Sequence, residues 1–457
     1  MGGGMNETTA VTATTDLTDT CARLIDLARK AGADAAEAVA HSSRSLGVSV
    51  RLGALEDVSR SEEDELGLRV FVGTRTASIN LSGQQADLAE VVERAVAMAR
   101  AAPEDPYARL ARPDELAQPP FADCDAADPR EPSPEELRAA AEEAEDAGRA
   151  VEGVTNSDGA GCEYSSARLA IATSEGFVGE LAGTSHVIGC SLVGGSGSDK
   201  QRDYEQRAAR HREDLPAPAD IGREAARRTV ARLGSGRLKS GAMPVVFDTR
   251  IGASLIGHLI GAMSGAAAAR RSTFLLERMG ETLFDSGIHV VEEPHRKRGL
   301  RSRPFDGEGL PTADRVLVDA GAPTGWLTNL SAAEQLGIAP TGHASRGSAG
   351  AAGIGVSNVT LRPGTVSRRE LMADIDDGVF VTELIGQGVN SVTGDYSRGA
   401  AGYRIRGGEI AGPVAEFTIA GNLIDMFAAL VPADDLETWR ALAVPTLRID
   451  GMRIAGE

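Results

Sequence analysis

Residues 382–422 read TELIGQGVNSVTGDYSRGAAGYRIRGGEIAGPVAEFTIAGN, and this stretch is the most specific signature of the chain. An apolar segment typical of a strand leads into a glycine-dense turn, and a second apolar strand follows the turn. Glycine permits unusual backbone angles and close approach of one backbone to another or to a ligand. Asn390, Ser391 and Asp395 have side chains that can form hydrogen bonds in this turn, and ordinary turn chemistry is the competing explanation for them.

This stretch closely resembles the carboxy-terminal motif of the TldE/PmbA branch of the TldD/TldE family. The likeness is strong over residues 243–422 and looser through SEEDELGLRVFVGTRTASIN at residues 61–80. The TldD branch of the family carries a zinc-protease motif, His-Glu-x-x-x-His, and the TldE branch lacks it. Whether this chain can cleave a peptide by itself therefore depends on the residues at the motif positions.

The decisive positions lie in IGASLIGHLIGAMSGAAAAR, residues 251–270, where His258, Leu259 and Met263 stand at the motif positions. A zinc hydrolase needs imidazoles to hold the ion and a carboxylate to accept a proton from its water ligand. Leucine cannot accept a proton, and methionine is a poor, soft ligand for zinc. The comparison with TldD implies that this degenerate motif holds no metal and has no catalytic residue, which leaves His258 as a packed or hydrogen-bonded core histidine.

The resemblance also implies a role for the glycine-dense turn. Asn390, Ser391, Gly394, Asp395 and Tyr396 are the candidates for a peptide channel or a subunit contact, with an extended peptide captured by strand addition. The implied function is that of a non-catalytic subunit in a heteromeric metalloprotease that degrades or matures unfolded peptides. Its partner would be a TldD-like catalytic subunit that holds the zinc, and the isolated chain would be able to form a homodimer.

Two alternatives from other classes stay open at this point. One is a stand-alone peptidase with an unrecognised site. The other is a regulatory binding protein that acts on a topoisomerase or a toxin–antitoxin partner.

Composition limits the possible partners and compartment. The formal net charge of −19 would repel a phosphate backbone, so nucleic acid is not an expected partner. No segment has the composition expected of a membrane-spanning helix. The four cysteines form no CxxC pair and no compact disulfide framework, which favours free thiols in the cytoplasm. They are Cys21, Cys124, Cys162 and Cys190, and all precede His258, so none can supply the cysteine ligand that the resemblance to TldD places later in the chain.

The chain of 457 residues predicts several domains and an α+β fold. A disordered leader is expected at residues 1–15, followed by an α+β subdomain at 16–101 and a linker rich in proline and acidic residues at 102–132. A second α+β subdomain at 133–235 and a β-rich domain at 243–457 complete the domain prediction. Asp16 and the capping-box pair Ser133 and Glu136 predict the starts of two helices, and short strands are expected at 36–41 and 47–52. We expect helix-flanked antiparallel sheets in the amino-terminal region and a strongly curved or barrel-like sheet in the carboxy-terminal domain, since closure protects strand edges.

Two further clusters contain residue types that occur in catalytic sites. His289 and His295 flank Glu292 in HVVEEPH, but strand alternation separates neighbouring side chains, so we expect these polar side chains to lie at the protein surface. Asp306 and Glu308 in PFDGEG are a possible acid–base pair, although Asp-Gly and Glu-Gly steps are ordinary turn formers, and we favour a turn.

Overall fold

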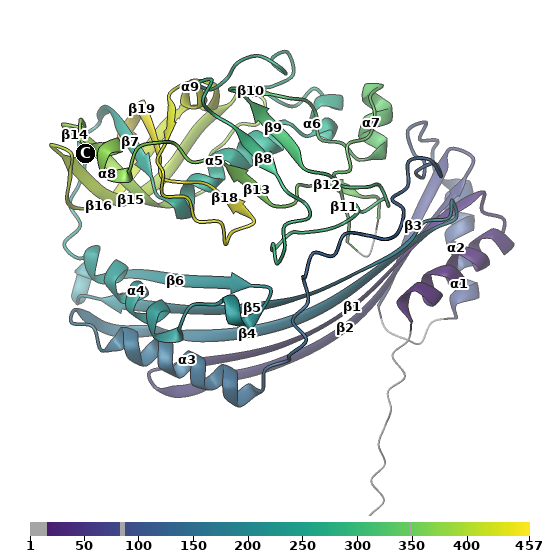
Figure 1. Ribbon diagram of the computed structural model, residues 1–457, viewed down its shortest axis with the longest axis horizontal. Coiled ribbons are helices and arrows are strands. Elements are labelled where there is room, and N and C mark those ends of the chain that lie inside the picture. Colours follow the sequence, from purple (N-terminus) through teal and green to yellow (C-terminus); the bar gives the residue numbers. More distant parts are fainter. Residues whose placement is uncertain (1–15, 83–86, 348–349) are drawn as a thin grey trace, which may run out of the picture.

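The computed structural model describes residues 16–82, 87–347 and 350–457, and the predicted leader at 1–15 lies outside the described residues. Two layers make up the fold: a long, curved antiparallel sheet and a β-rich carboxy-terminal part that lies along one of its faces (Figure 1). The predicted α+β class is confirmed.

The long sheet has six strands in the order β3-β2-β1-β4-β5-β6, and all its pairs are antiparallel. The strands are β1 (Ala35–Arg51), β2 (Ala54–Val72), β3 (Arg75–Ser82), β4 (Val154–Thr173), β5 (Val178–Gly194) and β6 (Gln201–Ala209). Strands of both predicted amino-terminal subdomains therefore share one sheet. Where the sequence predicts two short strands, at 36–41 and 47–52, β1 is continuous.

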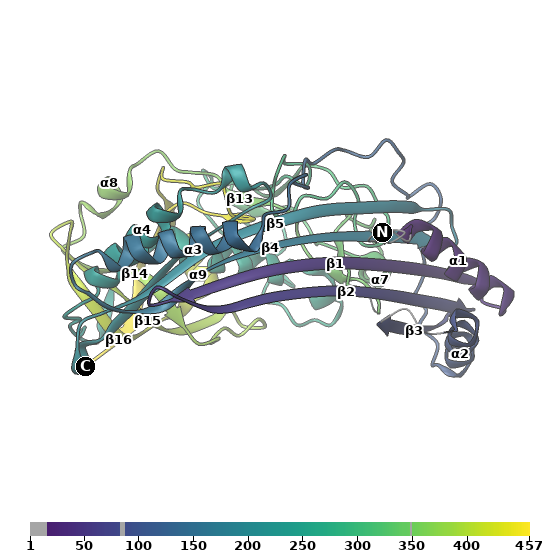
Figure 2. The ribbon, with the colours of Figure 1, turned by 90° about the horizontal axis from the view of Figure 1, so that it is seen from below.

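Helices cover the sheet face opposite the carboxy-terminal part (Figure 2). They are α1 (Leu17–Lys30), α2 (Leu88–Ala101), α3 (Pro134–Arg149) and α4 (Pro218–Ala231). The α1 helix begins after its cap Asp16, and α3 begins with the predicted capping box of Ser133 and Glu136. These local signals define where both helices start.

Strand alternation assigns the two faces of β1 to different cores. At each end of β1, alternate residues pack under the helices, namely Ala36, Ala38 and Ala40 at one end and Leu46, Val48 and Val50 at the other. The intervening Val39 faces the other layer and packs in a cluster with Phe305, Leu310 and Leu330 of the carboxy-terminal part. Residues 102–132 pass between the layers, and Leu116 and Ala117 join this same cluster, so the segment is part of the packing between the layers.

A closed barrel forms the centre of the carboxy-terminal part. Its strands follow the order β16-β15-β14-β7-β19, and pairing of β16 with β19 closes the ring. They are β7 (Gly241–Phe247), β14 (Asp377–Ile385), β15 (Asp395–Arg406), β16 (Glu409–Asn422) and β19 (Leu447–Ala455), with β17 (Leu430–Pro432) paired to β19. The predicted barrel-like sheet is confirmed, and residues 382–422 supply the hairpin of β15 and β16.

Smaller elements surround the barrel. The strands are β8 (Val290–Glu292), β9 (Arg315–Asp319), β10 (Ala322–Pro323), β11 (Ala344–Ser345), β12 (Gly353–Ile354), β13 (Val359–Leu361) and β18 (Leu442–Ala443). The helices are α5 (Thr249–Ala262), α6 (Gly265–Ala269), α7 (Leu330–Leu336), α8 (Arg368–Met372) and α9 (Leu423–Ala428). Across the described ranges, helices fall short of the length and apolarity that crossing a bilayer requires.

Candidate functional site

The helix α5 carries the degenerate motif and begins directly after β7. Its cap Asp248 accepts a hydrogen bond from the backbone of Arg250, which fixes the start of the helix. Leu255, Ile256 and Leu259 recur at helical spacing and are fully buried in the largest apolar core. Because these three side chains face the core, His258 lies on a different, less buried face of α5.

The three motif positions have different environments. Leu259 and Met263 are 0% exposed and belong to the apolar core. His258 is half-buried, and its ring lies edge-on to that of Tyr396 with 6.2 Å between the ring centroids. Burial lowers the pKa of His258, and the positive charge of Arg398 lowers it further, so the imidazole is neutral near pH 7. The Nε2 atom of His258 is buried and has no hydrogen-bond partner among the described residues.

The polar residues of the glycine-dense turn bind one another. The side chain of Asn390 accepts hydrogen bonds from the backbone of Val392 and Thr393. Asp395 accepts a hydrogen bond from the hydroxyl of Thr393 at 2.7 Å. Gly394 has a φ of +81°, a conformation that favours glycine. Turn chemistry therefore accounts for the side-chain contacts of Asn390 and Asp395, and a channel or subunit role for them stays a prediction.

Backbone contacts attach this turn to the rest of the barrel. The carbonyl of Ser391 accepts a hydrogen bond from the backbone of Phe274, and the carbonyl of Gly394 accepts one from Leu423. The turn is thereby held against two segments distant in the sequence. Among the candidates, Asn390, Ser391 and Asp395 are exposed, whereas Gly394 is buried and Tyr396 is 1% exposed.

Of the predicted residues, the structure brings His258 and Tyr396 together. Arg398 belongs to the same group and was missed by the sequence analysis. It lies two residues after Tyr396 on β15, so both side chains are on one face of the strand. This spacing indicated that Tyr396 and Arg398 share a strand face, but it could not show that this face packs near α5.

Three consecutive domain profiles match the sequence. They describe the PmbA/TldA metallopeptidase domain 1 at residues 36–99, the central domain at 127–233 and the C-terminal domain at 240–456. The metalloprotease PmbA of Escherichia coli O157:H7 is 34% identical over 429 residues, which cover 93% of each chain. The chain belongs to the PmbA/TldD metallopeptidase family.

Other relatives support the same assignment. A PmbA homologue of Haemophilus influenzae is 34% identical over 437 residues, covering 94% of each chain. The crystal structure of TldE from Thermococcus kodakarensis shares the fold with a TM-score of 0.84 at 23% identity, covering 95% of this chain and 99% of that one. The predicted resemblance to the TldE/PmbA branch is confirmed.

The metal implied by the description of the PmbA/TldD family does not fit the residues around His258. Zinc sites in peptidases use three protein ligands and keep a position for water. Here the neighbouring motif side chains are the hydrocarbon of Leu259 and the core residue Met263, and the positive charge of Arg398 acts on His258. Within the described ranges, His, Cys, Asp and Glu form no group of three or more able to hold a metal. We therefore assign no reaction step to a metal at this position.

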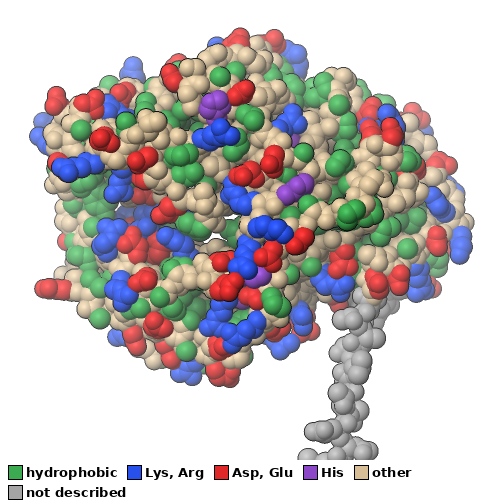
Figure 3. Space-filling view, in the orientation of Figure 1, with side chains coloured by type: hydrophobic (Ala, Val, Ile, Leu, Met, Phe, Trp, Pro, Cys, Tyr) green, Lys and Arg blue, Asp and Glu red, His purple; other side chains and the backbone are tan. Residues whose placement is uncertain are grey.

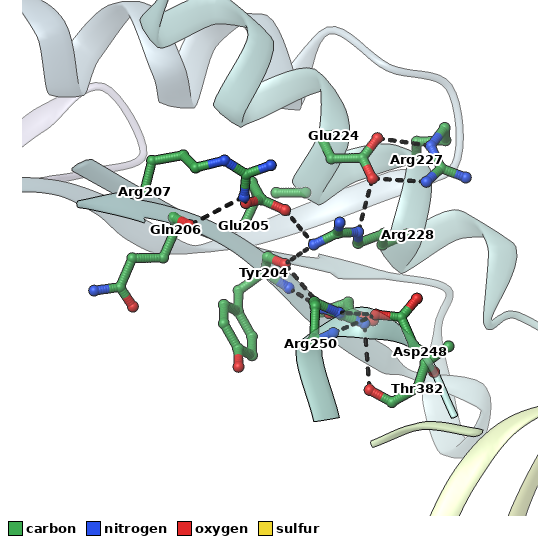
Figure 4. Close-up of polar contacts among 12 residues, drawn as sticks. Tyr204, Glu205, Gln206, Arg207, Glu224, Arg227, Arg228, Asp248, Arg250 and Thr382 are labelled. Atoms are coloured by element: carbon green, nitrogen blue, oxygen red, sulfur yellow. Dashed lines mark hydrogen bonds and ion pairs between the residues drawn. The ribbon is translucent and has the colours of Figure 1, made fainter. Parts of the chain in front are cut away.

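An ionic network attaches α5 to the long sheet. At the start of the helix, Arg250 donates to Asp203 of β6 at 3.0 Å. Arg250 also donates to the carbonyl of Thr382 at 3.4 Å (Figure 4). Beside it, Arg228 of α4 pairs with Glu205 of β6. Lys, Arg, Asp and Glu side chains also gather along the hollowed boundary between the layers in the space-filling view (Figure 3). The network holds the degenerate motif in a defined orientation to the sheet.

A second ionic contact joins the layers at the other end of the sheet. Glu37 of β1 accepts two hydrogen bonds from Arg346 at 2.7 and 2.8 Å, and Arg69 lies 3.4 Å from it. The turn of Asp306 and Glu308 packs beside this contact. The carboxylate of Asp306 accepts hydrogen bonds from three backbone amides, as expected of a turn.

The prediction that the polar side chains of HVVEEPH lie at the protein surface was wrong for Glu292. This residue is 3% exposed and accepts hydrogen bonds from His343 and Ser357. The reason is that β8 lies between β9 and β13, so one of its faces is covered by the barrel core. His343 and Ser357 lie more than fifty positions after Glu292 in the sequence, so the alternation of nearby residues gives no sign of these contacts.

Glu308 is expected to make stability depend on pH. Burial and the neighbouring Asp306 raise the pKa of Glu308 to about 8. Because the folded state retains this proton while the unfolded state loses it near pH 4.5, stability falls as pH rises from about 5 to 8. The loss from this group is about 1.4 kcal/mol per pH unit. Urea unfolding from pH 5 to 9 should show this slope as a difference between wild type and Glu308→Gln, and parallel pH profiles would contradict it.

Proposed function

We propose that this chain is the non-catalytic subunit of a heteromeric zinc metallopeptidase that degrades or matures unfolded peptides in the cytoplasm. A TldD-like partner would hold the zinc and supply the proton acceptor. The observation that carries the proposal is the burial of Leu259 at the position where the TldD motif has glutamate. A fully buried hydrocarbon side chain can neither accept a proton nor approach a water ligand.

Within such a complex, this subunit would complete the chamber and present substrate to the zinc of the partner. The glycine-dense turn at 386–394 supports this role because it is largely exposed and is held rigidly to the barrel by backbone hydrogen bonds. A rigid, glycine-rich backbone suits strand addition by an extended peptide, since main-chain groups supply the affinity. The isolated chain would be able to form a homodimer through the surface that the partner normally covers.

The cytoplasmic assignment rests on cysteine chemistry. Cys21, Cys124, Cys162 and Cys190 are all free and buried. Burial raises the pKa of Cys21, Cys162 and Cys190 to about 12, so these thiols are protonated and unreactive at neutral pH. Free, unreactive thiols suit a reducing compartment.

Mixing the purified chain with a TldD-like protein from the same genome tests the proposed function. We expect no cleavage of an unstructured peptide by the chain alone with added zinc, and cleavage once the partner is present. Substituting the glutamate of the partner's His-Glu-x-x-x-His motif should abolish cleavage, which provides the control. Zinc-dependent cleavage by the isolated chain, with stoichiometric zinc bound to it, would overturn the proposal.

A further inference from the structure

Three polar groups around His258 lack partners. The Nε2 atom of His258, the hydroxyl of Tyr396 and the Nε atom of Arg398 are buried, and none has a hydrogen-bond partner among the described residues. A buried polar group without a partner costs about 1–3 kcal/mol. Three such groups in one place indicate a site that is completed by a ligand.

The charge of the surrounding residues indicates whether that ligand is an anion or a cation. Within the described ranges, Arg398 forms no ion pair with a carboxylate, although acidic residues outnumber basic ones in this chain. Arg398 is also the charge that acts on both neighbours, because it lowers the pKa of His258 and opposes the rise that burial causes in Tyr396. Burial still raises the pKa of Tyr396 to about 12, so its hydroxyl keeps a proton to donate. The group offers donors and one positive charge.

The helix leaves space beside these groups. Gly261 lies one turn after His258 on α5 and is exposed, and a Cβ atom added there would meet no heavy atom within 4 Å. Residues three apart on a helix lie on the same face, so this open space borders the side of α5 that carries His258. The surface of α5 at Gly261 therefore has room for a ligand next to His258.

We infer that His258, Tyr396 and Arg398 form a binding site for a carboxylate, located where the catalytic branch of the family binds its metal. A guanidinium binds the two oxygens of a carboxylate in matched geometry, and the Tyr396 hydroxyl adds a donor from the same strand face. The neutral ring of His258 donates through Nε2 in the tautomer protonated there. A cation is excluded because Arg398 would repel it.

The carboxylate belongs to a peptide, and this step rests on the proposed function. It comes either from the carboxy terminus or from an acidic side chain. A site of this kind would position one end or one acidic residue of a substrate relative to the zinc of the partner. The subunit would then contribute selectivity without contributing chemistry.

Calorimetry on the isolated full chain tests the site without any cleavage. Three N-acetylated, unstructured peptides serve as probes. The first has a free carboxy terminus and no acidic residue, the second is its amidated form, and the third is the amidated form with one internal residue replaced by glutamate. We expect a carboxylate-bearing peptide to bind at least about tenfold more tightly than the peptide without one, as for hydrogen bonds to charged groups. The two carboxylate-bearing peptides distinguish a terminal from a side-chain source.

Variants assign the effect to the site. Arg398→Gln should abolish the preference for a carboxylate and Tyr396→Phe should weaken it, with both variants folded by circular dichroism. Arg406→Gln removes the same charge from the exposed end of the same strand and should keep the preference. Equal binding of all three peptides, no binding of any of them at millimolar concentration, or an unchanged preference in both site variants would overturn the inference. None of these results bears on cleavage by the mixed subunits, so the two proposals fail separately.

Discussion

Replacing Leu259 with glutamate is expected to destabilise the protein by about 3–5 kcal/mol, the loss typical of an unpaired buried charge. Leu259 is 0% exposed and packs in the core formed by α5 and the barrel. A carboxylate there would lose its hydration, and no described cation pairs with it at this position. Urea unfolding of wild type and variant at pH 7 measures the effect.

The matched control introduces the same residue two positions along the same helix. Gly261→Glu places a carboxylate on the open face of α5 and should change stability by less than about 1 kcal/mol.

The double variant Leu259→Glu/Met263→His has the residue types of the zinc motif at all three positions. We nevertheless expect it to bind no stoichiometric zinc, because both substituted positions point into the core. A stable double variant that binds zinc would show that the helix can turn its motif outward and would contradict this account.

Replacing Glu37 with alanine is the second large effect, with an expected loss of about 3–5 kcal/mol because it leaves buried cations unpaired. The side chains of Glu37 and Arg346 are 2% and 4% exposed, and Arg69 is nearly as buried. The pair joins the long sheet to the carboxy-terminal part, so its loss should weaken the contact between the layers. Differential scanning calorimetry and urea unfolding measure the change. Glu62→Ala, at an exposed pair with Arg60, should cost under about 1 kcal/mol.

The same ion pair predicts sensitivity to acid. Burial by itself would raise the pKa of Glu37, but the charges of Arg346 and Arg69 outweigh it and hold the pKa below its usual value. The stabilisation is therefore present above the unfolded pKa near 4.5 and is lost as pH falls through the lower, folded value. Wild type should lose this contribution in acid, whereas Glu37→Ala should not. An equal acid dependence of the two proteins would show that Glu37 does not contribute in this way.

Local signals in the sequence were sufficient where structure depends on neighbouring residues. Asp16 and the Ser133–Glu136 box start helices within a residue of the predicted positions, because a cap contacts only the next turn. The barrel-like class followed from many short strands that need closure. The split of β1 into two predicted strands was wrong, since weak β propensity at residues 42–46 is overridden by pairing with β2 and β4 on both sides.

The candidate site was predicted in part. The loss of the zinc motif at Leu259 and Met263 is a matter of side-chain identity and can be read directly from the residues. The burial of both positions, and the environment of His258, depend on how α5 packs against the barrel. Arg398 was missed because nothing near it in the chain indicates that its strand face meets that helix.

The sequence by itself determined the family, the helix starts and the absence of a second imidazole and a proton acceptor, because each of these depends on residue identity or on contacts within one helical turn. Only the tertiary structure decided that the ring of Tyr396 packs against that of His258 and that the charge of Arg398 acts on His258. It also decided that Glu37 pairs with Arg346 across 309 positions of the chain. Such contacts form when closure of the barrel and its docking on the sheet bury charges that then require partners. The spacing of residues in the sequence does not show which charges will be buried or which partners they will find.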